Sequence, residues 1–445
     1  MLRNSTIAAA VTALDETMRR EAKRHLWWSR FMGNVQKVES YNNDTDFAAS
    51  GKPIEVQSLK GGPGLGDRML IPMLMELAGL GRLGDAVMLG NEEDFARKYA
   101  MIHYNQIRHA VPVKKGKKDY SNEEILRMME YCQPLLSWWH AQRENWEIIS
   151  SIYLGAGEAL TTGTTDATFG QGLGIDKRVH PNLYTHSSDV LTRIGTAGKY
   201  PTMAETYTAI NGAAGNGDDF ATDTLRLARK LVYNTLYMKP MFTISGNKYW
   251  GILVDPAQAD TLRADAMFIS NGSSAPLNYS INEHPDITGS IGVYGNFVVF
   301  EDPVAVRGYT TLTAAGAAGD PNTDGSINVL GSTTAVYDET DKANPRFLPQ
   351  TGRTQSSSGA AYANHGAIII GGSMLGKADY DGLSFQTEEF DYANWKGISA
   401  GAMYGYERLD FIPEVRTPTR SETTTASATN VYNRSSAIIL TFQAE

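Results

Sequence analysis

The chain has 445 residues, of which 42% are hydrophobic and 20% charged; this composition excludes wholesale disorder, and the length suits about three domains. Its 40 Lys and Arg against 49 Asp and Glu give a net charge of -9, the sign opposite to that of proteins that grip many nucleic-acid phosphates. The single cysteine, Cys132, excludes an internal disulfide and a cysteine-based zinc site.

The N-terminal segment is predicted to be helical. Apolar residues recur every three to four positions from Ile7 to Leu26, and Ser5 can cap the first turn. Its basic residues are interpreted as a solvent-exposed helix face rather than a nucleic-acid site, because the net charge of the chain is negative.

From Gly51 to Lys118 the chain is rich in glycine and proline, and its apolar residues follow no helical or alternating period. Within it, only Asn91–Asn105 is predicted as a helix, with Asn91 as its cap. So long a segment without a core of its own is unusual inside a compact domain. Large apolar residues such as Met69–Met75 argue against disorder. We therefore expect the segment to project from the body and to pack on other chains.

The strongest helix signal is the capping box formed by Ser121 and Glu124. Pro134 is expected to interrupt this helix and to start a second one, since a proline at the first position sacrifices no hydrogen bond. The second helix, Leu135–Leu154, would be about 30 Å long. It carries three tryptophans: Trp138, Trp139 and Trp146. We expect at least two of them to be buried by the chain itself or by a neighbouring one.

The second half of the chain mixes helices and strands. A helix is predicted at Thr222–Met238, and another follows Asp255 as cap, with Pro256 as its first residue. The predicted strands are Tyr249–Val254, Ile291–Val293, Phe297–Glu301, Ala367–Ile370, Ile398–Tyr406 and Ser436–Phe442. The Gly-, Ala-, Ser- and Thr-rich segment Gly308–Gly359 is interpreted as a surface insertion.

One motif imitates a phosphate loop. Gly371–Lys377 follows an apolar strand and matches G-x-x-x-x-G-K. A phosphate loop next needs a Ser or Thr for magnesium and a helix that faces the phosphate. Ala378 stands in place of the hydroxyl residue, and Asp379–Gly382 predicts no helix. Nucleotide binding is therefore not expected.

Another motif imitates a calcium loop. Asp320, Asn322 and Asp324 place oxygen ligands at alternating positions before a glycine. The twelfth position, which should be a bidentate glutamate, is Gly331. An Asx-rich surface turn is favoured, with a weak calcium site as the alternative.

No other pattern predicts chemistry. The eight histidines include no pair with metal-ligand spacing, and no G-x-S-x-G elbow is present. No apolar run approaches the roughly 20 residues that span a bilayer, and no signal-peptide core follows Arg3. We expect no catalytic residue, no cofactor, no metal site and no membrane partner.

Several segments together resemble the major capsid proteins of tailed bacteriophages, specifically the N4-like group. The resembling segments are His25–Gly33, Leu77–Glu93, Gln106–Val111, Trp139–Gly155, Tyr249–Phe268, and Phe390–Tyr392 with Gly397–Ile398 and Gly405–Tyr406. These short matches are scattered, but their order and spacing over some 400 residues are fairly specific.

The resemblance implies an α+β protein of the Hong Kong-type phage capsid fold. Its parts would be an N-terminal arm (1–50), an extended loop (51–118), a peripheral domain with a spine helix (119–240), an axial domain (241–385, including the insertion 308–359), and a return to the peripheral domain with a C-terminal strand (386–445). The insertion departs from the short family core, and we expect it on the outer face.

The function implied is structural, with no enzymatic activity: self-assembly into the hexamers and pentamers of an icosahedral head that encloses double-stranded DNA. The implied partners are copies of the chain, portal, scaffold and decoration proteins, and packaged DNA without sequence-specific contact. The chain would reside in the virion, and in the host cytoplasm during assembly. A net charge of -9 on every copy would repel DNA rather than trap it.

Two alternatives stay open from sequence. One is an encapsulin-like compartment shell. The other, from a different class, is a hydrolase or calcium-dependent carbohydrate-binding protein built on the β-rich second half. An enzyme should gather titratable groups around a pocket, whereas a shell protein should carry an arm that projects beyond its body.

Overall fold

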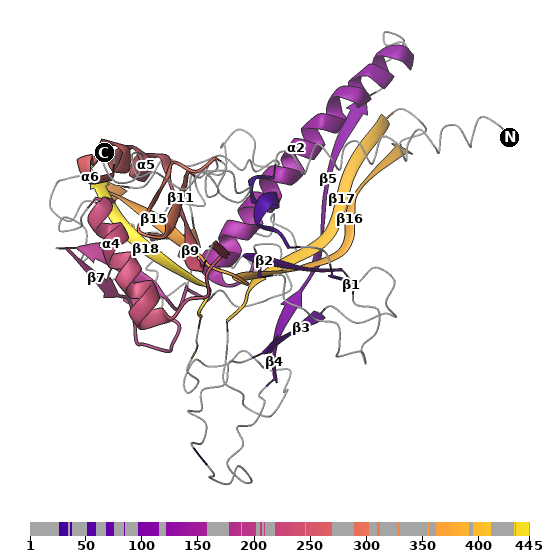
Figure 1. The fold of residues 1–445 in the computed structure, drawn as a ribbon. Helices are drawn as coiled ribbons and strands as arrows, with labels where there is room; N and C mark the ends of the chain where they lie inside the picture. Colours follow the sequence, from indigo (N-terminus) through magenta and orange to yellow (C-terminus); the bar gives the residue numbers. More distant parts are fainter. Residues whose placement is uncertain are drawn as a thin grey trace.

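The computed structural model describes residues 26–33, 36–37, 51–58, 68–74, 84, 97–114, 122–157, 178–187, 189–201, 205–206, 209, 219–244, 246–268, 289–301, 309–311, 327–329, 354–355, 362–390, 395–410, 431 and 433–444 (Figure 1). The N-terminal helix predicted from Ile7 and the calcium-like turn of Asp320, Asn322 and Asp324 lie outside these residues, apart from Leu26.

Two sheets form the body. The five-stranded sheet has the order β1-β2-β16-β17-β5. Its strands are β1 (Gln36–Lys37), β2 (Ile54–Ser58), β5 (Asn105–Lys114), β16 (Leu375–Phe390) and β17 (Trp395–Arg408). Strand β17 pairs with β16 and β5 antiparallel, whereas β2 joins β16 in parallel.

The nine-stranded sheet has the order β10-β11-β9-β15-β18-β6-β7, with β8 on β9 and β14 on β15. Its strands are β6 (Leu183–Ser187), β7 (Val190–Arg193), β8 (Phe242–Ile244), β9 (Asn247–Val254), β10 (Gly292–Tyr294), β11 (Phe297–Glu301), β14 (Thr354–Gln355), β15 (Tyr362–Ile370) and β18 (Ser436–Ala444). Together with β17 of the five-stranded sheet, these include the six strands predicted in the second half of the chain, which are confirmed: β9, β15, β17 and β18 are longer than predicted, and β10 is shifted by one residue.

Two small pairs complete the strands. Strands β3 (Arg68–Leu74) and β4 (Arg97–His103) form one antiparallel ribbon. Strands β12 (Tyr309–Thr311) and β13 (Ile327–Val329) form the other, inside the predicted insertion.

Helix α2 (Asn122–Leu154) runs unbroken through Pro134, so the prediction of two helices is wrong. The proline removes one backbone donor, a local loss. Beyond it, buried side chains such as Ile148 and Ile152 fasten the helix to the body. At 1.5 Å per residue, α2 is about 50 Å long. Its outer part extends beside β5, β16 and β17, away from the nine-stranded sheet (Figure 1).

The tryptophans of α2 are less buried within the chain than the residues that follow them. Trp138 is 52% exposed, and Trp139 and Trp146 are half-buried. Trp139 stacks on His109 of β5 at 4.5 Å between ring centres. Burial of at least two of the three by a neighbouring chain stays a prediction.

The segment 51–118 is not wholly without a core, contrary to expectation. Its two ends, β2 and β5, belong to the five-stranded sheet, and Ile54 and Val56 are buried. The predicted helix at Asn91–Asn105 is also wrong, because residues 97–103 form β4. In each case the strand partner lies far away in the sequence, where local patterning gives no sign of it.

The remaining helices lie close to their predicted positions. Helix α4 (Thr222–Lys230) continues into the π-helix η2 (Leu231–Leu236), so the predicted helix widens in its last turn. Helix α5 (Pro256–Ala264) is capped by Asp255, whose side chain accepts a hydrogen bond from the Gln258 backbone N–H, as predicted. A short helix α6 (Ala266–Phe268) follows, and a 3₁₀ helix η1 (Trp27–Phe31) lies near the N-terminus.

The core has two main layers, one on each face of the nine-stranded sheet. On one face α4, η2 and α5 pack through side chains such as Leu225, Val232 and Leu262. The other layer joins α2 and η1 to residues of both sheets, including Tyr153 and Phe300. Because one hydrophobic cluster contacts both sheets, α2 ties them into a single body.

Gly371–Lys377 forms no phosphate loop, as predicted. Its first four residues, Gly371–Met374, are a turn after β15, and Leu375–Lys377 begin strand β16 rather than a helix. A Cβ at Gly371 would lie 2.5 Å from the backbone oxygen of Lys239. The glycine there allows two backbone segments to approach each other closely.

We predict that Gly405→Ala lowers stability by about 1–3 kcal/mol. A Cβ at Gly405 would lie 1.9 Å from the backbone oxygen of His103, so β17 and the end of β4 would have to separate. The matched control is Gly382→Ala in β16, where no atom lies within 4 Å of the new Cβ. Thermal melting of both variants checks this; equal melting temperatures would contradict it.

Candidate functional site: buried polar clusters at both sides of α2

The end of α2 is buried, so its last carbonyl groups need partners inside the protein. The helix has no basic residue in its own last turn, where a cation would offset the exposed carbonyl dipoles. Arg408, at the end of β17, donates from Nη1 to the Ile152 carbonyl at 2.7 Å. The Arg178 backbone N–H donates to the Leu154 carbonyl at 2.8 Å. Residues distant in sequence therefore cap the helix.

Arg408 is held by a carboxylate. Its Nε lies 3.0 and 2.9 Å from the two Asp410 carboxylate oxygens, and its Nη2 lies 2.8 Å from one of them. Asp410 also accepts hydrogen bonds from the Tyr200 hydroxyl at 3.0 Å and from Asn433 Nδ2 at 2.8 Å. This forked geometry requires arginine, because lysine offers only a point charge.

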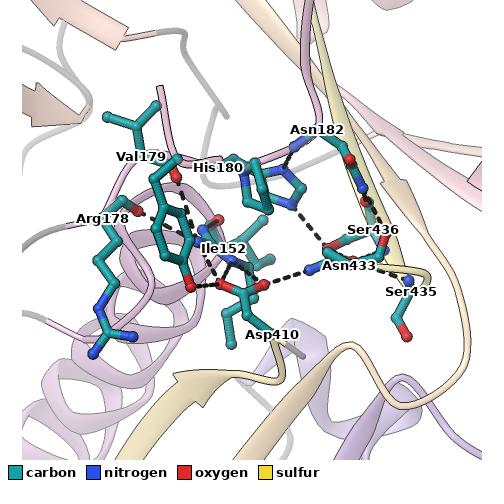
Figure 2. Close-up of polar contacts among 12 residues, drawn as sticks. Ile152, Arg178, Val179, His180, Asn182, Asp410, Asn433, Ser435 and Ser436 are labelled. Carbon is teal, nitrogen blue, oxygen red and sulfur yellow. Dashed lines mark hydrogen bonds and ion pairs between the residues drawn. The ribbon is translucent and has the colours of Figure 1, made fainter. Parts of the chain in front are cut away.

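The cluster continues into β18 (Figure 2). Asn433 Oδ1 accepts hydrogen bonds from the backbone N–H groups of Ser435 and Ser436. Asn182 Nδ2 donates to the Asn433 carbonyl at 2.6 Å, and its backbone N–H donates to His180 Nδ1 at 3.0 Å. His180 Nε2 therefore carries the proton that it shares with Ser436 Oγ at 2.9 Å. We call this set, Arg178, His180, Asn182, Tyr200, Arg408, Asp410, Asn433 and Ser436, the junction.

The junction disfavours a second positive charge. Burial lowers the pKa of His180 well below its ordinary 6.5, and the nearby Arg408 and Arg193 lower it further. Burial and the charge of Asp410 raise the pKa of Tyr200. Both side chains therefore stay neutral at pH 7.

A second buried cluster fastens the middle of α2 to the five-stranded sheet. Glu144 Oε1 accepts a hydrogen bond from Lys377 Nζ of β16 at 2.5 Å and another from the Tyr406 hydroxyl of β17. Burial alone would raise the pKa of Glu144, but the charges of Lys377 and His140 and these hydrogen bonds lower it overall. Burial alone would lower the pKa of Lys377, yet Glu144 and Asp379 raise it. The pair is therefore charged over a wide pH range.

A third polar contact positions α5. The carboxylate of Asp255, the cap of α5, pairs with His365 Nδ1 of β15. Gln258 Nε2 donates to Thr441 Oγ1 of β18 at 2.8 Å. The start of α5 is thus held to the two central strands of the nine-stranded sheet.

These clusters hold α2, α5 and the two sheets together. Each charged group faces an opposite charge or a helix end, and none of the contacts described above needs a bound ligand. In the described part of the chain, no group of three or more His, Cys, Asp or Glu is arranged to hold a metal ion. No helix within the same ranges has the length and apolar composition needed to cross a membrane.

Sequence reasoning missed both clusters. Arg408, Asp410, Glu144 and Lys377 belong to no motif. Arg408 meets Ile152, and Lys377 meets Glu144, across more than 200 positions, whereas Asp410 binds the nearer Arg408 and Asn433. The only sequence signal for the junction is the lack of a basic residue at the end of α2.

Three comparisons with known proteins agree with one another. A family model described as "Phage capsid protein" matches residues 29–437. The major capsid protein of Pseudomonas phage KPP25 is 23% identical over 352 residues, which are 78% of each chain.

Solved structures with a similar fold include the capsid of Ralstonia phage GP4, with a TM-score of 0.52, 14% identity, and coverage of 94% of this chain and 90% of that one. The acidic stable capsid of Helicobacter pylori bacteriophage KHP30 has a TM-score of 0.50, 14% identity and 88% coverage of each chain.

We predict that Lys377→Met destabilises the protein by about 3–5 kcal/mol, because it leaves Glu144 buried without its cation. The double variant Glu144→Gln/Lys377→Met should be more stable than Lys377→Met alone, since no unpaired charge remains. Denaturant unfolding of the two single variants and the double variant measures this coupling. If the two substitutions add independently, the pair does not hold α2.

We also predict acid sensitivity at the junction. The pKa of His180 is lower in the folded protein than in the unfolded chain. Below about pH 6.5, therefore, His180 binds a proton in the unfolded chain but not in the folded protein. The free energy of unfolding therefore falls as the pH falls. His109 and His140 act in the same direction.

The variant His180→Gln removes this titration at the junction. Its melting temperature should therefore fall less than that of the parent protein between about pH 7.5 and about pH 5.5. Equal falls in both proteins would contradict a role for His180.

Proposed function

The chain belongs to the phage capsid protein family and is a structural major capsid protein of a phage, and from this premise we propose that its copies form the hexamers and pentamers of an icosahedral head that encloses double-stranded DNA. The predicted α+β Hong Kong-type capsid fold is confirmed by the family match and the similar phage capsids. Membership of the N4-like group stays a prediction.

The observation that carries the proposal is an elongated body with exposed apolar side chains about midway along α2. Helix α2 and the outer parts of β5, β16 and β17 extend from the nine-stranded sheet (Figure 1). On this extension Leu135 is 64% exposed and Trp138 is 52% exposed. Large apolar side chains that gather on a rigid rod are typical of contacts between chains.

We assign the nine-stranded sheet with α4 and α5 to the axial domain, and the five-stranded sheet with α2 to the peripheral domain. Helix α4 and strands β6, β7 and β18 then join the axial domain, although the sequence boundaries put them in peripheral segments. The reason is hydrogen bonding: β18 lies between β15 and β6 in one sheet.

The β3–β4 ribbon is the part of segment 51–118 that we propose to contact a neighbouring copy. It is tied to the body at its base. The His103 backbone N–H donates to Glu407 Oε1 of β17 at 2.8 Å, and Tyr104 stacks on Tyr380 of β16. A ribbon fixed at one end can reach outward without loosening the sheet.

We further propose that the insertion 308–359 lies on the outer face of the head, where extra residues do not disturb contacts between subunits. Portal, scaffold and decoration proteins are the partners expected of such a subunit. An enzymatic role has no support in the two clusters beside α2, because their ionisable groups are paired and buried rather than gathered around an open pocket.

We predict that Trp138→Ala blocks assembly while it leaves the subunit folded. Because half of the side chain is exposed, its loss should cost the isolated subunit no more than about 1 kcal/mol. The control Trp28→Ala truncates a fully buried side chain and should cost about 3–5 kcal/mol.

Negative-stain microscopy of the purified protein, together with thermal melting, distinguishes these outcomes. Closed shells formed by Trp138→Ala would show that this face does not join subunits. A parent protein that forms no shell under any assembly condition would contradict the proposed function itself.

A further inference from the structure

The outer face of α4 is basic, although the protein as a whole is acidic. Arg226, Arg229 and Lys230 are exposed on the side opposite to the buried Leu225 and Ala228. Arg226 forms an exposed ion pair with Asp223 at 3.0 Å. The tertiary structure places these residues beside further polar groups.

One turn and one strand of the nine-stranded sheet continue this face. The Cδ atom of Arg229 lies 3.6 Å from the position that a Cβ on Gly295 would occupy, in the turn between β10 and β11. The next residue, Asn296, donates from Nδ2 to the backbone oxygen of Lys248 in β9, at 2.9 Å. Lys248 is also exposed. Arg229 and Lys248, from separate elements, therefore flank one turn.

The π-helix η2 adds aromatic side chains to the same face. The Tyr233 ring lies 4.8 Å from the ring of the buried Trp250, and the Arg229 guanidinium lies 5.9 Å from the Tyr233 ring. Tyr237 ends η2 in the left-handed region, with φ of 45°, and is 69% exposed. A π-turn followed by a non-glycine left-handed residue is costly, and such geometry is frequent at functional sites.

We call Arg226, Arg229, Lys230 and Lys248 the α4 basic surface. In contrast to Arg408 and Lys377, the cations Arg229, Lys230 and Lys248 form no ion pair with any residue in the described part of the chain. The four basic residues accompany two nearby acidic residues, Asp223 and the Asp265 bound to the start of α4, whereas the whole chain has 40 basic against 49 acidic residues. The charge on this face is locally inverted.

From this inversion we propose that the α4 basic surface binds the phosphate backbone of double-stranded DNA, without reading its sequence. The inference rests on the proposed function, in which the shell encloses DNA. Unpaired lysine and arginine side chains that bind phosphates release condensed counterions, which supplies affinity of this kind. Exposed tyrosine hydroxyls beside them can donate to phosphate oxygens.

A second copy of the chain is the alternative occupant, which the test below distinguishes from DNA. The exposed carboxylates that could face a basic surface include Asp260 and Glu301. Both of these are already bound by Arg263, at 3.2 and 2.6 Å. The proposal therefore requires the outer face of α4 to point toward the interior of the head, and a reconstruction of closed shells with this face outward would overturn it.

The test measures binding of the full-length protein, as soluble capsomers, to a fluorescein-labelled duplex of about 30 base pairs by fluorescence anisotropy, from about 50 to about 200 mM KCl. The site variant is Arg229→Gln/Lys248→Gln, which removes one cation from α4 and one from β9. We expect weaker binding, and a slope of log K against log salt that is shallower by about 1.8.

The matched control is Arg108→Gln/Lys199→Gln, which removes one exposed arginine and one exposed lysine elsewhere and changes the net charge equally. It should leave the slope nearly unchanged. Equal effects of the two variants, or no effect of either, would overturn the proposal.

Microscopy separates the remaining outcomes. A site variant that binds DNA like the parent but fails to form shells would assign this face to contacts between copies and would overturn DNA binding. If the parent forms shells and the variant forms shells with weakened DNA binding, both the function and the surface stand.

Discussion

The rest of the structure depends on how the buried end of α2 is neutralised. A long helix concentrates unpaired carbonyl groups at its C-terminus, and this end lies inside the protein, where water cannot satisfy them. Arg408 resolves the problem from the end of β17, and Asp410 fixes its guanidinium in place. Because Asp410 also binds Asn433, just before β18, the same contact joins the helix to both sheets.

This arrangement suits a subunit whose helix and sheets must keep fixed relative orientations. The ion pairs lie within the body, between α2 and the sheets, so salt screens them less than it screens surface pairs. Burying these charged groups costs desolvation free energy, which offsets much of the attraction between them. The ion pairs therefore fix one orientation of α2 more than they add net stability. The apolar side chains of Leu135 and Trp138 are left exposed on the outer part of the same helix. The rigid body thereby holds these exposed apolar side chains in a fixed direction.

The charge of the protein is also distributed unevenly over its surface. A net charge of -9 predicts repulsion between the chain and DNA, yet the repulsion concerns the average surface. The α4 basic surface is assembled from a helix and a strand that meet only in the folded chain, and it inverts the sign locally. On the proposed function, a shell built of such subunits would contact DNA at the α4 basic surfaces and repel it elsewhere.

The sequence by itself determined the elements with local signals: the capped helix α5, the amphipathic helix α4, the strands of the second half, and the absence of a phosphate loop at Gly371–Lys377. Each rests on residues within a few positions of one another. It could not determine that α2 continues through Pro134, that β2 and β5 enter a sheet, or that residues 97–103 form a strand, because partners far along the chain override local preference. Both buried clusters are likewise decided only by tertiary structure. Arg408 meets Ile152, and Lys377 meets Glu144, across more than 200 positions, and the need for these partners arises only once the helix is buried between the sheets.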